Sequence, residues 1–362
     1  MNLLTSWFKR TFADPQVVIL GIVLVVGVAI VAGLGRMLAP VFAGIVIAYL
    51  LEAAVVRFQK LGLPRLASVS LVFLLFLASL FLFLFGLVPK LIRQLTQLVQ
   101  QIPNYITQGT ELLQQLPERY PKMVTEEQVQ NLITGAGNEL ATTGQQFLTW
   151  SLASVGNIVS LLVLLVLIPV LVFFILKDKD QLINWFKGYL PDERHLVTSV
   201  WADVEAQIAN YVRGKAGEIV IVGGVSYITF VTLGLQYSAL LATIVGFSVL
   251  IPYIGAAVVT VPIAFVAFFQ WGWGWSFGQV LIAYAIIQAL DGNVLVPLLF
   301  SEALNLHPVA IIVAILVFGG LWGFWGVFFA IPLATVVQAV LKAWPRNPEE
   351  ADTAEENSEE AA

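Results

Sequence analysis

The amino-acid sequence predicts an all-α, polytopic integral membrane protein with about eight spans. Of its 362 residues, 59% are hydrophobic and only 11% are charged, whereas soluble domains carry roughly 25% charged residues. Tryptophan is abundant, with 10 residues, as expected where indole rings lie at the level of the lipid headgroups. The chain has no cysteine, which excludes disulfides, thiol catalysis and cysteine-based metal sites. The lipid bilayer is therefore the expected surroundings of most of the chain.

Hydropathy places eight apolar segments in order along the chain. They are expected near 16–35, 37–56, 66–88, 151–176, 216–235, 239–270, 277–299 and 308–342. The first is too long for the apolar part of a signal peptide, so we expect an uncleaved helix. The resulting division has a three-span segment (1–88), an outer loop (89–150), a fourth span (151–176), a cytoplasmic segment (177–215), a transport core (216–344) and an acidic tail (345–362).

The distribution of basic residues predicts the orientation. Of the 18 Lys and Arg residues, only Arg36, Lys90, Arg93, Arg119 and Lys122 fall on the side opposite the termini in this eight-span arrangement. Cytoplasmic loops carry the excess of basic residues, so both termini are expected in the cytoplasm. The acidic run at 349–360 has too few apolar residues to fold and is expected to be a solvated tail.

Both connecting segments show amphipathic helical spacing. In the outer loop, apolar residues recur at helical spacing from Leu91 to Ile102, and we expect that helix to stop at Pro103. It would lie on the outer membrane face or pack on neighbouring subunits. In the cytoplasmic segment, two amphipathic helices are expected on either side of Pro191-Asp192. They would lie at the membrane interface or take a gating or assembly role.

No motif indicates an enzyme. The two histidines, His195 and His307, have no partners at metal-ligand spacing, and no phosphate-binding loop of the GxxxxGK[ST] type occurs. Because His307 directly precedes Pro308, we interpret it as a helix cap or interface residue. Neither a cofactor, a metal nor a nucleic acid is expected to bind.

Two apolar stretches, 239–270 and 308–342, are too long for one simple crossing. A helix of 32 residues is about 48 Å long, against a hydrocarbon core of about 30 Å. Each stretch must tilt, protrude or break into half-helices, and single tilted spans and re-entrant hairpins both stay open. The candidate hinge residues are Pro252, Gly255, Pro262, Pro297, Gly319, Gly320, Gly323, Gly326 and Pro332. Paired interruptions of this kind are typical of a transporter's binding site, although the glycines could instead allow close helix packing.

The interruptions resemble each other. Gly255 precedes Pro262 by seven residues, and Gly326 precedes Pro332 by six. Proline clashes with the carbonyl four residues back, so Pro332 frees the carbonyl of Phe328 just as Pro252 frees that of Ser248. We interpret the two stretches as versions of one broken segment.

Polar residues within the apolar third are the candidate contacts along a permeation path. A carboxylate inside a span is costly, so Asp291 is expected to face a cavity, a partner or a substrate. Gln288 and Asn293 lie close by in sequence, and Pro297 frees the Asn293 carbonyl at an expected Asp291-Gly292-Asn293 turn. The alternative places Asp291 at the outer interface or in an internal ion pair. Further candidates are Tyr253 as a hydrogen-bonding group and Trp322 or Trp325 as an aromatic platform.

A basic elbow is predicted where the cytoplasmic segment meets the fifth span. Arg213 and Lys215 flank Gly214, and Glu218 lies about one helical turn further on. We expect Arg213 to pair with an acidic group or a helix C-terminus and to hold the elbow as a structural anchor.

At these residues the chain resembles a known family. The residues that carry the resemblance are, in order, Ala39 and Pro40, Ala48 to Glu52, Leu176 to Lys179, Asn210 to Lys215, Ile251 to Ala256, Gln288 to Asn293, Pro297, Leu306 to Pro308, Phe318 to Gly326 and Ala330 to Ala334. The set is similar to the AI-2E family, the autoinducer-2 exporter family of bacterial permeases, and to its PerM-type branch in particular. The resemblance implies an eight-span, homo-oligomeric protein of the bacterial inner membrane.

Three functional hypotheses follow. The first is a secondary transporter or facilitator of a small polar solute, for which the resemblance implies autoinducer-2-like furanones. The second is a sodium–proton or other cation/proton antiporter in which Asp291, with Glu302, carries the proton. The third is a membrane scaffold that transports nothing. Dependence of flux on an ion gradient separates the first two, and a scaffold would show no flux.

Overall fold

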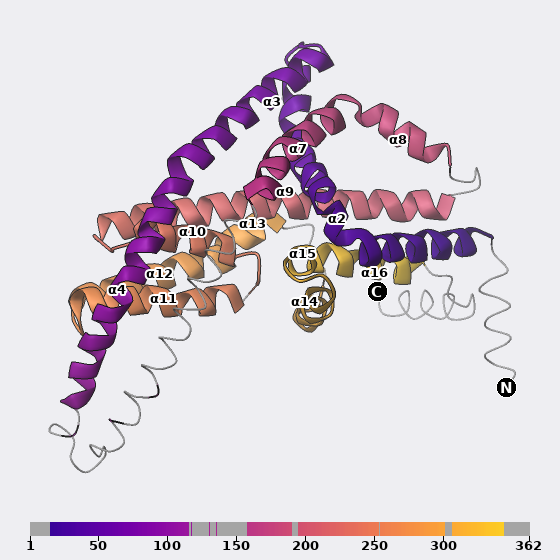
Figure 1. The fold of residues 1–362 in the computed structure, drawn as a ribbon. Coiled ribbons are helices and arrows are strands. Elements are labelled where there is room, and N and C mark those ends of the chain that lie inside the picture. The colour runs from indigo at the N-terminus through magenta and orange to yellow at the C-terminus, as the bar shows by residue number, and fades with distance from the viewer. Residues whose placement is uncertain are drawn as a thin grey trace, which may run out of the picture. The chain divides into compact units, whose positions relative to one another are not determined.

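The computed structural model describes residues 15–115, 117, 130, 135, 158–189, 195–252, 254–300 and 306–343, drawn as coloured ribbon in Figure 1. The chain divides into two compact units. One unit consists of Met1–Leu50, Asp178–Lys215 and Leu298–Ala362, and the other of Leu51–Lys177 and Ala216–Pro297. Within the described ranges every regular element is a helix and no strand occurs. The prediction of an all-α membrane protein is confirmed. The acidic tail and most of the outer loop lie outside these ranges.

Five helices in the described part of the chain are long and apolar enough to cross a membrane. They are Met37–Lys60, Arg65–Gln114, Glu205–Thr232, Ile254–Trp271 and Trp275–Phe300. The count of eight spans stays a prediction.

The N-terminal region differs from the sequence-based expectation. Two helices were expected, at 16–35 and 37–56, but α2 runs without a break from Pro15 to Lys60 through Pro40. Breaking a helix in an apolar medium leaves N–H and C=O groups unpaired, at several kcal/mol per group. One proline inside the helix costs less, about 3 kcal/mol, because most backbone bonds survive.

The next helix is also longer than expected. The helices α3 (Arg65–Leu82) and α4 (Val88–Gln114) join through η1 (Phe83–Leu87), a single π-helical turn, into one run of 50 residues. The expected stop at Pro103 is wrong, since α4 continues past it. The ring of Tyr105 lies 5.5 Å from that of Phe265 and 4.9 Å from that of Phe269, so α4 packs against α11 just after Pro103.

The segment 177–215, expected to be cytoplasmic, is helical, and its last helix continues without a break into the expected fifth span. Helix α7 (Ile158–Lys177) is followed by α8 (Lys179–Lys187) and by α9 (His195–Thr232). The break expected at Pro191-Asp192 lies outside the described residues.

Both long apolar stretches are broken, and the breaks overlap the interruptions predicted at 251–255 and 319–326. The first consists of α10 (Ser238–Ser248) and α11 (Ile254–Trp271), which we call the first hairpin. The second consists of α14 (Pro308–Trp322), α15 (Phe324–Phe328) and α16 (Ala330–Ala343), which we call the second hairpin. In chain order, the first hairpin is followed by α12 (Trp275–Leu290), the π-helical turn η2 (Asp291–Leu295) and α13 (Val296–Phe300), and then by the second hairpin.

The main core belongs to the unit that contains the first hairpin. Figure 1 shows α10, α11 and α12 side by side, with α4 crossing them. Val222 and Phe230 of α9, Val245 of α10, Ile263 of α11 and Val280 of α12 are all buried there. Helices α9 and α10 approach closely at two glycines, since a Cβ on Gly246 would lie 3.1 Å from the Cα of Gly223.

Candidate functional site

The break of the first hairpin depends on a glycine that nothing larger can replace. Residues Val249 to Pro252 form the turn, and a Cβ on Gly255 would overlap the carbonyl oxygen of Ser248, lying 2.7 Å from its carbon. The Ser248 carbonyl, freed by Pro252, accepts a hydrogen bond from the Ile251 N–H at 3.1 Å. The carbonyl freed at the break is therefore paired within the hairpin turn itself. Tyr253, a predicted contact at this turn, lies outside the described residues.

The open end of the first hairpin is tied together by side chains. Gln270, at the end of α11, donates to the Gly234 carbonyl and accepts from the Gln236 N–H, both at 2.8 Å. Gln94 of α4 accepts from the Leu240 N–H in the first turn of α10, also at 2.8 Å. Because the beginning and the end of this stretch lie together, it is a helical hairpin and not a single tilted helix.

A polar stripe on α12 faces this hairpin. Tyr284, Gln288 and Asp291 are spaced i, i+4 and i+7, which places them on one face of a helix. The Tyr284 hydroxyl donates to the Ala256 carbonyl at 2.9 Å, one residue after Gly255. The stripe therefore begins beside the hairpin turn. The carbonyl of Ala256 also accepts from the Thr260 hydroxyl at 2.8 Å.

Two members of the stripe place polar atoms in protected surroundings. The amide nitrogen Nε2 of Gln288 is buried and has no hydrogen-bond partner among the described residues, and one carboxylate oxygen of Asp291 is buried as well. Buried polar groups are normally paired, so an amide donor left in this way is available to a ligand. Asp291 as a whole is half-buried inside a candidate membrane span.

The expected turn at Asp291-Gly292-Asn293 is instead the π-helical turn η2. The Val296 N–H bonds to the Asp291 carbonyl, five residues back. Pro297 has no N–H to give to the Asn293 carbonyl, so widening the helix by one residue re-pairs the neighbouring groups. Asn293 is exposed and donates to the Ala289 carbonyl at 2.8 Å. Asn293 thus bonds its own helix, whereas Gln288 and Asp291 share the helix face of Tyr284, which contacts the hairpin.

The second hairpin repeats the glycine contact of the first. A Cβ on Gly326 would overlap the Phe318 carbonyl oxygen and lie 2.5 Å from its carbon, and one on Gly319 would lie 2.8 Å from a methyl of Val327. Gly323 has φ 60°, which favours glycine, whereas Gly320 faces open space. The glycines of this stretch therefore both allow close packing within the hairpin and interrupt the helix.

The two tryptophans of the predicted platform stack on their own hairpin. Trp322 stacks on Phe318 with 5.7 Å between ring centroids, and Trp325 on Phe329 with 6.2 Å. They belong to the unit that holds the second hairpin, whereas Gln288 and Asp291 belong to the other unit.

Arg213, at the predicted elbow, makes its hydrogen bonds within its own helix. Its guanidinium donates to the Ala209 carbonyl at 3.2 Å and to the Asn210 side chain at 3.0 Å, both on its own helix, and no acidic group contacts it in the part of the chain that the structure describes. Lys215 and Glu218 are almost fully buried, at 5% and 2% exposure. Gly214 lies against the ring of Phe300. The ring of Phe300 thus packs against Gly214 and Lys215.

The predicted hinge residue Pro262 and the predicted cap His307 have simple roles. Pro262 lies inside α11 without ending it, and His307 caps α14 by accepting from the Val309 N–H at 3.2 Å. The cap interpretation of His307 is confirmed.

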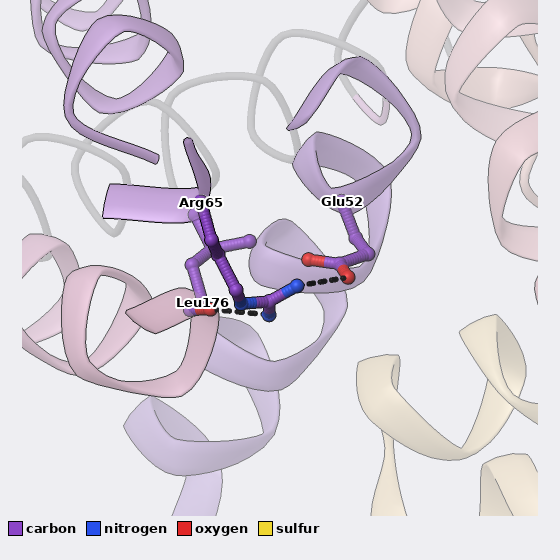
Figure 2. A network of polar contacts seen from close by, with 3 residues as sticks. All are labelled: Glu52, Arg65 and Leu176. Carbon is purple, nitrogen blue, oxygen red and sulfur yellow. Dashed lines mark hydrogen bonds and ion pairs between the residues drawn. The ribbon is translucent and has the colours of Figure 1, made fainter. Parts of the chain in front are cut away.

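Two polar residues were missed by sequence reasoning. Tyr284 could have been found from its i, i+4, i+7 spacing with Gln288 and Asp291. Arg65 carries no such signal: it donates to the Glu52 carboxylate at 3.4 Å and to the Leu176 carbonyl at 2.8 Å (Figure 2). It thereby ties α2 and the first residue of α3 to the end of α7.

Apolar helices, two broken hairpins and a polar stripe beside one of them define a multi-pass membrane protein of the transporter class. Residues 17–346 match the family model described as AI-2E family transporter, and the chain belongs to that family. It is 45% identical to the "Putative permease PerM" of Escherichia coli strain K12, over 95% of this chain and 98% of that protein. It is 28% identical to the "Putative transport protein YrrI" of Bacillus subtilis strain 168, over 83% and 85%. The relatives are named as permeases and transport proteins, not as enzymes.

Proposed function

We propose that this chain is a secondary transporter or facilitator of a small polar solute, and that the polar stripe of α12 contacts that solute. The observation that carries the proposal is the buried amide nitrogen of Gln288 beside the Asp291 carboxylate, on the helix face that meets the first hairpin. A transporter site needs a few converging polar groups in apolar surroundings, and broken membrane segments commonly border such sites.

The chemistry of the stripe suits a solute rich in hydroxyl groups. The Gln288 amide can donate to an oxygen of the solute, and the Asp291 carboxylate can accept from its hydroxyls. Autoinducer-2-like furanones have this character and are the candidate that the family description suggests. Tyr253 is a further candidate at the hairpin turn, Asn293 at the π-helical turn, and Trp322 and Trp325 on the second hairpin.

Flux into proteoliposomes tests this proposal. Autoinducer-2 uptake should saturate, and Gln288→Leu, which keeps the approximate size but removes the amide, should raise the half-saturating concentration about tenfold. Gln97→Leu is the matched control, since Gln97 is exposed on α4. If liposomes that contain the wild-type protein take up no more autoinducer-2 than empty liposomes, the proposed substrate is wrong.

Cation/proton exchange is the alternative function, and it rests on the Asp291 carboxylate inside a candidate span. In that case sodium flux should follow the proton gradient without any organic solute. A scaffold would show neither flux. The proposal further places the protein in the bacterial inner membrane as a homo-oligomer with both termini in the cytoplasm.

A further inference from the structure

Proline leaves one carbonyl at the break of the second hairpin without its usual donor. Pro332 has no N–H, so the Phe328 carbonyl four residues earlier cannot make the ordinary helical hydrogen bond. At membrane depth, such a carbonyl needs another partner within the protein or in a wet cavity.

The hydroxyl of Tyr211 supplies that partner. Its Oη donates to the Phe328 carbonyl oxygen at 3.2 Å, although the two residues are 117 positions apart in the chain. Tyr211 is only 2% exposed. Its ring also lies 6.5 Å from that of Phe328 and 6.0 Å from that of Phe300.

The part of α9 that carries Tyr211 packs closely against Phe300. One turn further along α9, Gly214 lies so near Phe300 that a Cβ would be 2.6 Å from a ring carbon. The buried ammonium of Lys215 lies 5.3 Å from the centre of the same ring. A cation over an aromatic face is stabilising, so Tyr211 is presented from a part of α9 with little freedom to move.

The first hairpin does not rely on another helix in this way. The carbonyl freed by Pro252, that of Ser248, accepts from the Ile251 N–H within the same turn. The Ser248 and Phe328 carbonyls, each freed by a proline, are therefore satisfied in different ways.

We propose that Tyr211 is a positioning residue for the second hairpin. Its hydroxyl holds α15 in place, and with it the segment that carries Trp322 and Trp325. The ordering of α15 follows from the hydrogen bond itself, while its effect on transport rests on the proposed function.

Hydrogen exchange of the full-length protein in nanodiscs tests this role. Tyr211→Phe keeps the ring contacts and removes only the hydroxyl. It should speed amide exchange at 323–333 about fivefold, the effect of losing one hydrogen bond. The control is Tyr227→Phe on the same helix, which removes the hydroxyl that accepts from the Lys90 ammonium at 2.7 Å. Tyr227→Phe should leave the rate of amide exchange at 323–333 unchanged. Unchanged exchange in Tyr211→Phe, or an equal rise in both variants, would overturn the inference.

Transport by the same two variants separates positioning from mere stability. With autoinducer-2 as the solute, Tyr211→Phe should lower the maximal rate several-fold at an unchanged half-saturating concentration, whereas Tyr227→Phe should transport like wild type. Faster exchange at 323–333 together with wild-type rates would overturn the positioning role. If the wild-type protein moves no autoinducer-2, the proposed substrate is wrong, and hydrogen exchange alone decides on the Tyr211 contact.

Discussion

Gly255 lies directly against the carbonyl of Ser248, at a distance that leaves no space for a side chain. Gly326 has the same relationship with the carbonyl of Phe318. Two segments 71 residues apart thus fold back on themselves by the same contact. In each, the half-helix after the break is seated on the last turn of the half-helix before it.

This contact predicts that a single methyl group will damage either hairpin. Gly255→Ala and Gly326→Ala should each lower stability by about 1–3 kcal/mol, because the methyl would meet backbone that cannot move aside. Thermal unfolding in detergent measures the effect. The control is Gly320→Ala in α14, where a Cβ would have nothing within 4 Å. Equal melting temperatures for Gly326→Ala and Gly320→Ala would show that the contact is not tight.

The Arg65 guanidinium predicts a second stability effect. It contacts the Glu52 carboxylate and the Leu176 carbonyl with two different nitrogens, and lysine has no such fork. Arg65→Lys should therefore destabilise the protein by about 1 kcal/mol. Arg57→Lys, at an exposed position of α2, provides the comparison. The account fails here if both variants melt at the wild-type temperature.

The distribution of basic residues predicts the orientation in the membrane. A cysteine replacing Lys187 should react with an impermeant thiol reagent only from the cytoplasmic side, and one replacing Gln114 only from outside. The chain has no cysteine of its own, so the labelling background is zero. Reversed labelling, or cytoplasmic labelling at both positions, would contradict termini in the cytoplasm.

Sequence reasoning succeeded where composition and local chemistry decide the outcome. Apolar composition predicted the membrane helices, and the positions of Pro252 and Gly323 predicted where the long stretches break. It failed where tertiary packing outweighs a local cost. Pro40 and Pro103 lie inside continuous helices, and beside Pro103 the ring of Tyr105 packs on α11.

Within the candidate site, sequence reasoning singled out polar residues but not their contacts. Gln288 and Asp291 stood out as polar residues in an apolar run, yet the π-helical turn and the bond from Tyr284 to Ala256 depend on contacts distant in sequence. Among the described residues no acidic group contacts Arg213, which instead donates to the Ala209 carbonyl and the Asn210 side chain of its own helix. Burial of Lys215 beside Phe300 had no sequence signal at all.

The most direct measurement for the central claim is solute flux with Asp291 neutralised. Asp291→Asn keeps the shape of the side chain and removes its charge. If the protein moves a neutral polar solute, this variant should reduce autoinducer-2 flux severalfold at most and leave any proton dependence nearly unchanged. Abolished gradient-driven transport with solute exchange intact would instead assign Asp291 a coupling proton. Wild-type flux in both Asp291→Asn and Asp291→Ala would contradict a site on the α12 stripe and move it to the break at 319–326.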